Sequence, residues 1–177
     1  MFKNPNFNRD LDFFSSNMKE FTQTSTFVSY DGIEELPTDV RRLMEKAVET
    51  RKTAYAPYSK FRVGAALLLD NGEIVVGSNQ ENAAYPSGLC AERVAVFHAG
   101  AAYPGARILM IAISAASDSG NTSAPIPPCG SCRQSIAEYE FRQEKPIPIY
   151  FTGETGPVYL SHSLKDLLPF TFDKNFL

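Results

Sequence analysis

Two short cysteine motifs constrain the fold of this chain more than any other feature of the sequence. Cys90 stands alone, and Cys129 and Cys132 form a Cys-x-x-Cys pair further along the chain. Each motif opens a segment whose apolar residues recur at helical spacing, so the spacing predicts a helix start at both places. If the three thiols act together, the fold has to bring the beginnings of two helices side by side.

The cysteines have three interpretations: inert core thiols, a redox pair, or metal ligands. Three cysteines make a poor disulfide framework, and a redox pair leaves Cys90 unexplained. Cys129 and Cys132 are three residues apart, so they share one helix face and can bind the same ion. Three protein ligands leave a coordination position free for water, as in catalytic zinc sites. Soft thiolate ligands around a position open to water favour zinc over iron.

Glu92 follows Cys90 by two residues, in the first turn of the expected helix. An acid at a helix start commonly complements the helix dipole. Beside a zinc ligand, however, a carboxylate can accept the proton of the metal-bound water, whose pKa zinc lowers towards about 7, and pass it to a substrate. We therefore predict that Glu92 is the catalytic proton carrier.

Helical and strand-like segments alternate along the chain, which predicts a layered α/β domain with a mixed five-stranded sheet flanked by helices. Asn71-Gly72 predicts a tight turn between two of the strands. We expect helices at 38–53, 90–101, 129–141 and 164–168, and strands at 61–70, 73–78, 107–116, 147–152 and 158–160.

Residues 1–37 are interpreted as an N-terminal extension and residues 38–177 as the single domain. Within the extension, residues 21–30 (FTQTSTFVSY) are rich in β-branched and aromatic side chains. This stretch is expected to add an edge strand to the sheet or to cover a subunit interface.

Charge and hydropathy narrow the class of partner. Lys and Arg number 17 and Asp and Glu number 20, giving a net charge of −3, whereas nucleic-acid-binding proteins usually carry a basic surplus. The longest apolar run, 63–69, is far shorter than the ~20 residues that a membrane span needs. We expect a cytoplasmic protein with a small-molecule substrate, bound neither to nucleic acid nor to a membrane.

The two cysteine motifs together resemble the signature of the zinc-dependent cytidine deaminases. Zinc deaminases share the pattern His-x-Glu … Pro-Cys-x-x-Cys, and it is this family pattern, more than the spacing alone, that carries the resemblance. Cys90 stands in place of the histidine, as in the small homotetrameric type. The resemblance covers 40–172, and its further segments are 55–61 (YAPYSKF), 63–66 (VGAA), 77–85 (GSNQENAAY), 90–93 (CAER) and 128–134 (PCGSCRQ).

The resemblance implies a three-layer fold and hydrolysis of cytidine and deoxycytidine to uridine and deoxyuridine plus ammonia, a reaction of pyrimidine salvage. Zinc-bound hydroxide attacks C4 of the base, and Glu92 shuttles the proton. The resemblance also implies one Zn²⁺ per chain, held by Cys90, Cys129 and Cys132. It further implies a homotetramer whose active sites are shared between subunits.

Substrate-binding roles carry over where the residues match. Asn79 and Glu81 resemble the pair that hydrogen-bonds the ribose hydroxyls, although polar residues in a loop commonly form turns. Phe61 resembles the aromatic residue of the nucleoside pocket, although a strand start is equally typical of a core residue. The backbone carbonyl of Ala91 is expected to accept from the pyrimidine amino group. Phe172 resembles a C-terminal aromatic residue that reaches a neighbouring subunit, and the nearby Phe170 and Phe176 are alternatives for this role.

Two further residues are expected to support the metal ligands from outside. Arg93 resembles a cation that hydrogen-bonds the thiolates, and the charge balance agrees, because three thiolates on Zn²⁺ leave a net charge of −1. Gln134 is expected to support the same surroundings. The two histidines, His98 and His162, are assigned no role in the site.

Two alternative functions remain at this point. In the first, the chain is a deaminase of the same fold that acts on an aminonucleoside antibiotic or another amino-pyrimidine. In the second, it is a non-catalytic zinc-binding module, which needs a fourth protein ligand, and the motif offers no good candidate for one.

Overall fold

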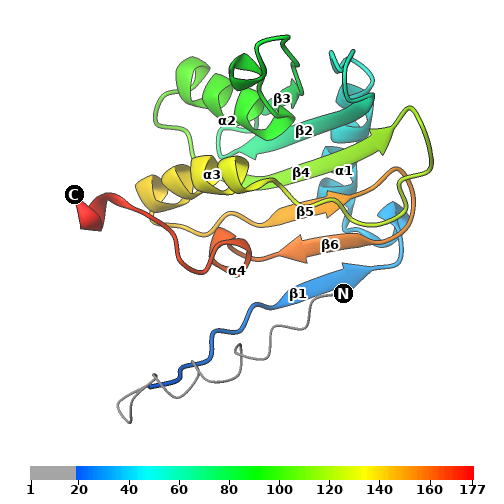
Figure 1. The fold of residues 1–177 in the computed structure, drawn as a ribbon. Coiled ribbons are helices and arrows are strands. Elements are labelled where there is room, and N and C mark those ends of the chain that lie inside the picture. The colour runs from blue at the N-terminus through cyan, green and yellow to red at the C-terminus, as the bar shows by residue number, and fades with distance from the viewer. Residues whose placement is uncertain (1–18) are drawn as a thin grey trace, which may run out of the picture.

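A mixed six-stranded sheet lies between helices on its two faces (Figure 1). The computed structural model describes residues 19–177, and within this part of the chain no helix is long and apolar enough to cross a membrane. The strands are β1 (Phe27–Tyr30), β2 (Phe61–Leu69), β3 (Ile74–Ser78), β4 (Ile108–Ser117), β5 (Ile149–Thr152) and β6 (Val158–Ser161). The helices are α1 (Thr38–Arg51), α2 (Ala91–Ala102), α3 (Gly130–Gln143) and the short α4 (Leu164–Leu167).

The strand order across the sheet is β1-β6-β5-β4-β2-β3. Strands β4 and β5 pair in parallel, while their neighbours pair antiparallel, so the sheet is mixed as expected. Helix α3 connects the two parallel strands, since a parallel pair needs a crossover connection. The α/β class is therefore confirmed.

The expected number of strands, five, is wrong, because β1 adds a sixth at the edge. Phe27 lies opposite Ser161 and Tyr30 opposite Val158 in an antiparallel ladder with β6. The backbone groups along β6 are paired in this way on the side away from β5. Only the last four residues of the strand-like run 21–30 form the strand, so the extension does add an edge strand.

Alternating side chains along the strands build a core on each face of the sheet. On one face, Ala65 and Leu67 of β2 pack with the buried sides of α2, α3 and α4. On the opposite face, Ala66 of β2 packs with α1 through Leu43 and Met44. The result is three layers, with the two helices that begin at the cysteine motifs in the same layer (Figure 1).

Near the site, the turn and the helix starts expected from the sequence lie close to the observed ones. The turn Asn71-Gly72 joins β2 to β3, and Gly72 has a φ of 88°, which a glycine adopts without strain. Cys90 and Cys129 are the residues immediately before α2 and α3, so each helix begins one residue later than expected.

Helix α2 lies directly against the backbone of β3 at Gly77. A Cβ atom at this position would stand 2.5 Å from the carbonyl oxygen of Ala91 and 2.6 Å from the amide nitrogen of Ala95. Both contacts are with backbone atoms, which cannot turn aside as a flexible side chain can. Gly77 therefore sets how closely the first turn of α2 approaches the sheet.

We predict that Gly77→Ala lowers the free energy of unfolding by about 3 kcal/mol, because the added methyl group forces α2 away from β3. Urea unfolding followed by circular dichroism measures this change. Gly120→Ala is the matched control, since a Cβ at Gly120 meets open space, and we expect a change within about 0.5 kcal/mol. Equal effects of the two substitutions would contradict the close-approach argument.

Candidate metal centre and active site

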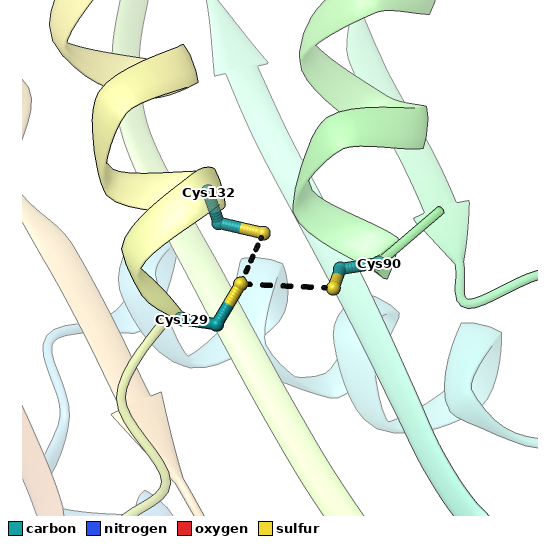
Figure 2. A group of neighbouring side chains, drawn as sticks. All are labelled: Cys90, Cys129 and Cys132. Atoms are coloured by element: carbon teal, nitrogen blue, oxygen red, sulfur yellow. Dashed lines mark hydrogen bonds between the residues drawn. The ribbon is translucent and has the colours of Figure 1, made fainter. Parts of the chain in front are cut away.

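The three cysteine side chains meet at the adjacent starts of α2 and α3. Figure 2 shows Cys90 at the beginning of one helix and Cys129 and Cys132 in the first turn of the other, with their sulfur atoms turned towards one another. The Sγ atoms of Cys90 and Cys129 are 3.8 Å apart, and those of Cys129 and Cys132 are 3.5 Å apart. All three sulfur atoms lie within 4.8 Å of one another.

This spacing matches what a tetrahedral zinc ion requires. With Zn–S bonds of about 2.3 Å, two sulfur atoms of a regular tetrahedron are separated by about 3.8 Å. The observed separations of 3.5 and 3.8 Å are close to this value. The cluster contributes three ligands and therefore leaves one tetrahedral position for water or a substrate.

Helix-start geometry explains why the thiols are free to face a metal. Cys90 and Cys129 both have extended backbone conformations at the N-cap position, and within residues 19–177 neither side chain caps its helix. The first N–H groups of each helix create a positive local potential, which stabilises thiolates. Two such ends side by side favour a cluster of negative sulfur ligands.

The thiols differ in how readily they ionise. A hydrogen bond from Cys132, with further ones from Cys129 and Arg93, lowers the pKa of Cys90 to about 5, although burial opposes the shift. The pKa of Cys132 is raised, first because its thiol donates to Cys90 and then because it is buried. The contacts among the thiols therefore favour ionisation of Cys90 over ionisation of Cys132.

Arg93 carries a positive charge that acts on Cys90. Its guanidinium donates from one terminal nitrogen to the carbonyl oxygen of Gly88 at 3.4 Å and helps to lower the pKa of Cys90. Its Nε atom is buried and has no hydrogen-bond partner within residues 19–177. A buried donor without a partner beside three thiols fits a site built for a metal with thiolate ligands.

Glu92 lies in the first turn of α2, with only 4% of its surface exposed. Burial, with a smaller contribution from the nearby Cys90 charge, raises the pKa of its carboxyl to about 7. A carboxyl with a pKa near neutrality can both accept and donate a proton at physiological pH, as general acid–base catalysis requires.

A cleft of about 530 Å³ opens beside the cysteine cluster. Two of its lining residues, Cys90 and Arg93, belong to the metal centre, and two others, Asn79 and Glu81, come from the loop after β3. The structure thus brings four of the predicted site residues to one cleft. Its volume is that of a typical small-ligand pocket.

Glu81 is held in place by the segment before β2. Its carboxylate accepts hydrogen bonds from the backbone N–H of Tyr58 at 2.9 Å, the N–H of Ser59 at 3.2 Å and the Ser59 hydroxyl. The Ser59 hydroxyl and these backbone groups lower the pKa of Glu81. Glu81 is therefore an oriented and ionised acceptor at the mouth of the cleft.

Asn79 is buried and ties its loop to the start of β2. Its side chain donates to the carbonyl oxygen of Phe61 at 2.9 Å and accepts from the N–H of Val63 at 2.8 Å. These bonds hold the backbone at Phe61, which is not among the residues that line the cleft. Ala91, the first residue of α2, is fully buried and is not among the residues that line the cleft.

Gln134, on α3, contacts the C-terminal tail at Phe172. The side-chain amide of Gln134 donates to the backbone carbonyl oxygen of Phe172 at 2.8 Å. Phe172 is 58% exposed, and its ring stacks on that of Phe176 with the ring centres 5.7 Å apart. The structure thus places Gln134 against the tail, and it leaves Phe172 on the surface of the chain.

The lining residues of the cleft that sequence reasoning missed include Ser59, Tyr58 and Tyr85. Ser59 orients Glu81, and the two tyrosines stand edge to face on the cleft wall with ring centres 6.1 Å apart. All three lie in segments that carry the family resemblance. The sequence around them is short, polar and typical of turns, so it does not predict the contacts that these residues make in the folded chain.

Residues 37–145 match the family described as the cytidine and deoxycytidylate deaminase zinc-binding region. The chain belongs to this family. A cytidine deaminase from Sporosarcina psychrophila is 42% identical over 139 residues, which cover 78% of this chain and 95% of that protein. One from Halalkalibacterium halodurans is 46% identical over 100 residues, covering 56% of this chain and 71% of that protein.

Solved structures agree with this membership of the deaminase family. The crystal structure of cytidine deaminase from Burkholderia pseudomallei superimposes with a TM-score of 0.65 and 38% sequence identity. The match covers 77% of this chain and 100% of that one, so this chain carries additional residues. Zinc is the metal of the family region, and the three-thiol cluster is suited to hold it.

We predict that the purified chain carries one zinc ion and that chelation destabilises it, because the ion binds the folded state and holds two helix starts together. The unfolding midpoint falls on chelation, and all three thiols become reactive towards a thiol reagent. Cys132→Ser reduces the zinc content by more than about tenfold. Ser131→Ala, between the two ligands, is the control and keeps its zinc; equal zinc loss in both variants contradicts the ligand assignment.

Proposed function

We propose that this chain hydrolyses cytidine and deoxycytidine to uridine and deoxyuridine, releasing ammonia. The observation that carries the proposal is the three-thiol cluster beside the buried Glu92, at a cleft that also holds Glu81. A metal with an open position, a carboxyl that titrates near neutrality and a hydroxyl-binding carboxylate are what a hydrolase of an aminonucleoside needs. The names of the relatives support cytidine as the substrate.

In this proposal Cys90, Cys129 and Cys132 hold the zinc ion, which supplies the Lewis acidity that lowers the pKa of water. Glu92 moves the protons. Its carboxylate takes a proton from the attacking water and delivers it to N3 of the cytosine ring as oxygen bonds to C4. It then takes the remaining hydroxyl proton and passes it to the amino group, so that the C4–N bond breaks and ammonia leaves.

Substrate recognition in the proposal rests on oriented acceptors. Glu81 accepts hydrogen bonds from the ribose hydroxyls, and its lowered pKa keeps it ionised as the pH falls through the ordinary carboxyl range. Asn79 assists and also holds the backbone of Phe61, the aromatic residue that we propose for the nucleoside pocket. The Ala91 carbonyl accepts from the amino group of the pyrimidine.

Support for the metal ligands completes this assignment of roles. The Arg93 guanidinium offsets the negative charge of the thiolates, which would otherwise weaken the zinc ion as a Lewis acid. The support of the metal ligands by Gln134 rests on the family resemblance, since its side chain binds the C-terminal tail. Three free thiols are kept reduced in the cytoplasm, where pyrimidine salvage takes place.

We also propose a homotetramer in which residues 38–177 form the catalytic domain and each site borrows a residue from a neighbour. Phe172 is the proposed contributor, and its exposure on the single chain supports this role. The exposed Tyr58 and Tyr85 at the cleft offer an aromatic surface that a neighbouring subunit can cover.

The test of the proposed reaction is ammonia release from a panel of cytidine, deoxycytidine, cytosine, adenosine and an antibiotic aminonucleoside. We expect turnover of the first two, and little turnover of cytosine, which has no ribose for Glu81 to bind. Glu92→Gln, which keeps the side-chain shape, lowers kcat by about 10² to 10⁴. The exposed Glu138→Gln on α3 is the matched control and keeps full activity.

The panel also separates the alternatives. Turnover of the antibiotic alone moves the function to that substrate class while keeping the zinc site. Zinc binding without turnover of any amino compound contradicts the enzymatic proposal and favours a binding module. Full activity in Glu92→Gln contradicts the proton-carrier role.

A second prediction concerns the neighbouring subunit. We expect a mass of four chains of 19.6 kDa in sedimentation equilibrium. Phe172→Ala raises KM for cytidine with the mass unchanged, because the ring covers a neighbour's pocket. Phe170→Ala is the control, since this ring packs edge to face on Phe21 of the same chain. If Phe170→Ala or Phe176→Ala raises KM instead, the contributor has been assigned to the wrong ring.

A further inference from the structure

The backbone around Cys129 is held on both sides by one residue, Arg133. The side-chain Nε of Arg133 donates to the carbonyl oxygen of Pro128 at 2.8 Å. Its backbone N–H donates to the carbonyl oxygen of Cys129 at 2.9 Å, as the first bond of α3. These two carbonyls belong to the peptide groups immediately before and after the Cys129 Cα atom.

Fixing both flanking peptide groups fixes the backbone dihedral angles of the residue between them. Cys129 has φ −66° and ψ 167°, an extended conformation at the helix N-cap. The direction of its Cα–Cβ bond, and so the region that its sulfur can reach, follows from these angles. Because Cys129 is exposed, close packing does not hold its side chain, and the backbone bonds carry more of the positioning.

The backbone at Cys90, the ligand that precedes α2, is held by different hydrogen bonds. The carbonyl oxygen of Leu89, which precedes it, accepts from the backbone N–H of Gln80 at 2.9 Å. The carbonyl oxygen of Cys90 itself accepts from the N–H of Val94 at 3.1 Å. Main-chain bonds thus hold both peptide groups at Cys90, whereas at Cys129 a side chain replaces one of them.

The guanidinium of Arg133 is itself anchored at its far end. A terminal nitrogen donates to the carbonyl oxygen of Leu167, at the end of α4, at 2.7 Å. Helix α4 is fixed in turn, because the buried Glu140 accepts from the N–H of Leu164 at 3.0 Å. Arg133 therefore bridges the ligand loop to a part of the fold that is already rigid.

We propose that Arg133 is a positioning residue for the metal centre, which sets the Cys129 thiolate through its bond to the Pro128 carbonyl. The hydrogen bond to Leu167 fixes the orientation of the guanidinium, and the hydrogen bond to Pro128 fixes the backbone of Cys129. Residues outside a metal's ligand set commonly change metal affinity by about 10- to 100-fold when they are replaced.

Two substitutions separate the two bonds. In Arg133→Gln, the amide nitrogen follows Cδ, as Nε does in arginine, so it can keep the Pro128 bond while the Leu167 bond is lost. In Arg133→Lys, the nitrogen lies one atom further out, so it can keep the Leu167 bond and the positive charge while the Pro128 bond is lost. If charge alone mattered, lysine would be the better replacement.

We expect instead that glutamine preserves zinc binding better than lysine does. The zinc dissociation constant, measured by competition with a chelator, rises about tenfold in Arg133→Lys and by less than about threefold in Arg133→Gln. The absorption of the cobalt-substituted protein reports the geometry of the thiolate ligands without any substrate. It changes in Arg133→Lys and stays near that of the unsubstituted protein in Arg133→Gln.

Arg142→Lys is the matched control, because Arg142 lies near the end of the same helix and stacks on Tyr139, 4.7 Å from the ring centre. It leaves both readouts unchanged. Equal zinc affinity in the two Arg133 variants, or tighter binding by Arg133→Lys, overturns the proposal. Equal loss of stability in the metal-free and zinc-loaded forms assigns Arg133 to the fold alone and also overturns it.

Arg133→Met provides a further comparison if Arg133→Lys does not fold. Methionine has no donor, so Arg133→Gln against Arg133→Met isolates the Pro128 bond. Tighter zinc binding and an unchanged cobalt spectrum in the glutamine variant support the proposal. The same affinity in both variants overturns it.

Discussion

The meeting of two helix N-termini is the constraint on which the site depends. Helices α2 and α3 pack in one layer on the sheet, and their starts bring Cys90 within 3.8 Å of Cys129 between sulfur atoms. Exposed N–H groups at each start favour negative charge, so the thiols gather where the backbone stabilises their ionised form. Gly77 permits this arrangement by letting the first turn of α2 lie directly on β3.

The charged residues around the cysteine cluster differ in their surroundings and therefore in their ionisation. Three thiolates on a zinc ion leave a negative centre, and Arg93 beside Cys90 reduces that charge. Glu92 has its pKa raised towards neutrality, chiefly by burial. Glu81, in contrast, stands at the cleft with hydrogen-bond donors around it and a lowered pKa. Two carboxyl groups of similar intrinsic acidity thus become suited to different tasks through their surroundings.

The N-terminal extension shows where local patterns stop being informative. The run 21–30 has strand-forming side chains, and its last four residues form β1. Its partner β6 lies more than a hundred residues away in sequence, so the pairing depends on which sheet edge the completed domain leaves open. The match to the Burkholderia pseudomallei structure covers 77% of this chain and all of that one, so this chain carries residues beyond the shared fold.

The sequence by itself determined the α/β class and the order of the helices and of five strands, because hydrophobic periodicity and turn residues are local properties. The set of three thiol ligands came from the resemblance of the two cysteine motifs to the zinc deaminase signature. The sequence also indicated Glu92, through its spacing from Cys90. Only the tertiary structure decided the sixth strand, the clamp of Ser59 on Glu81 and the bridge of Arg133 to Leu167. These contacts join segments that lie far apart in the chain, and they form only once packing has placed the backbone groups that they pair.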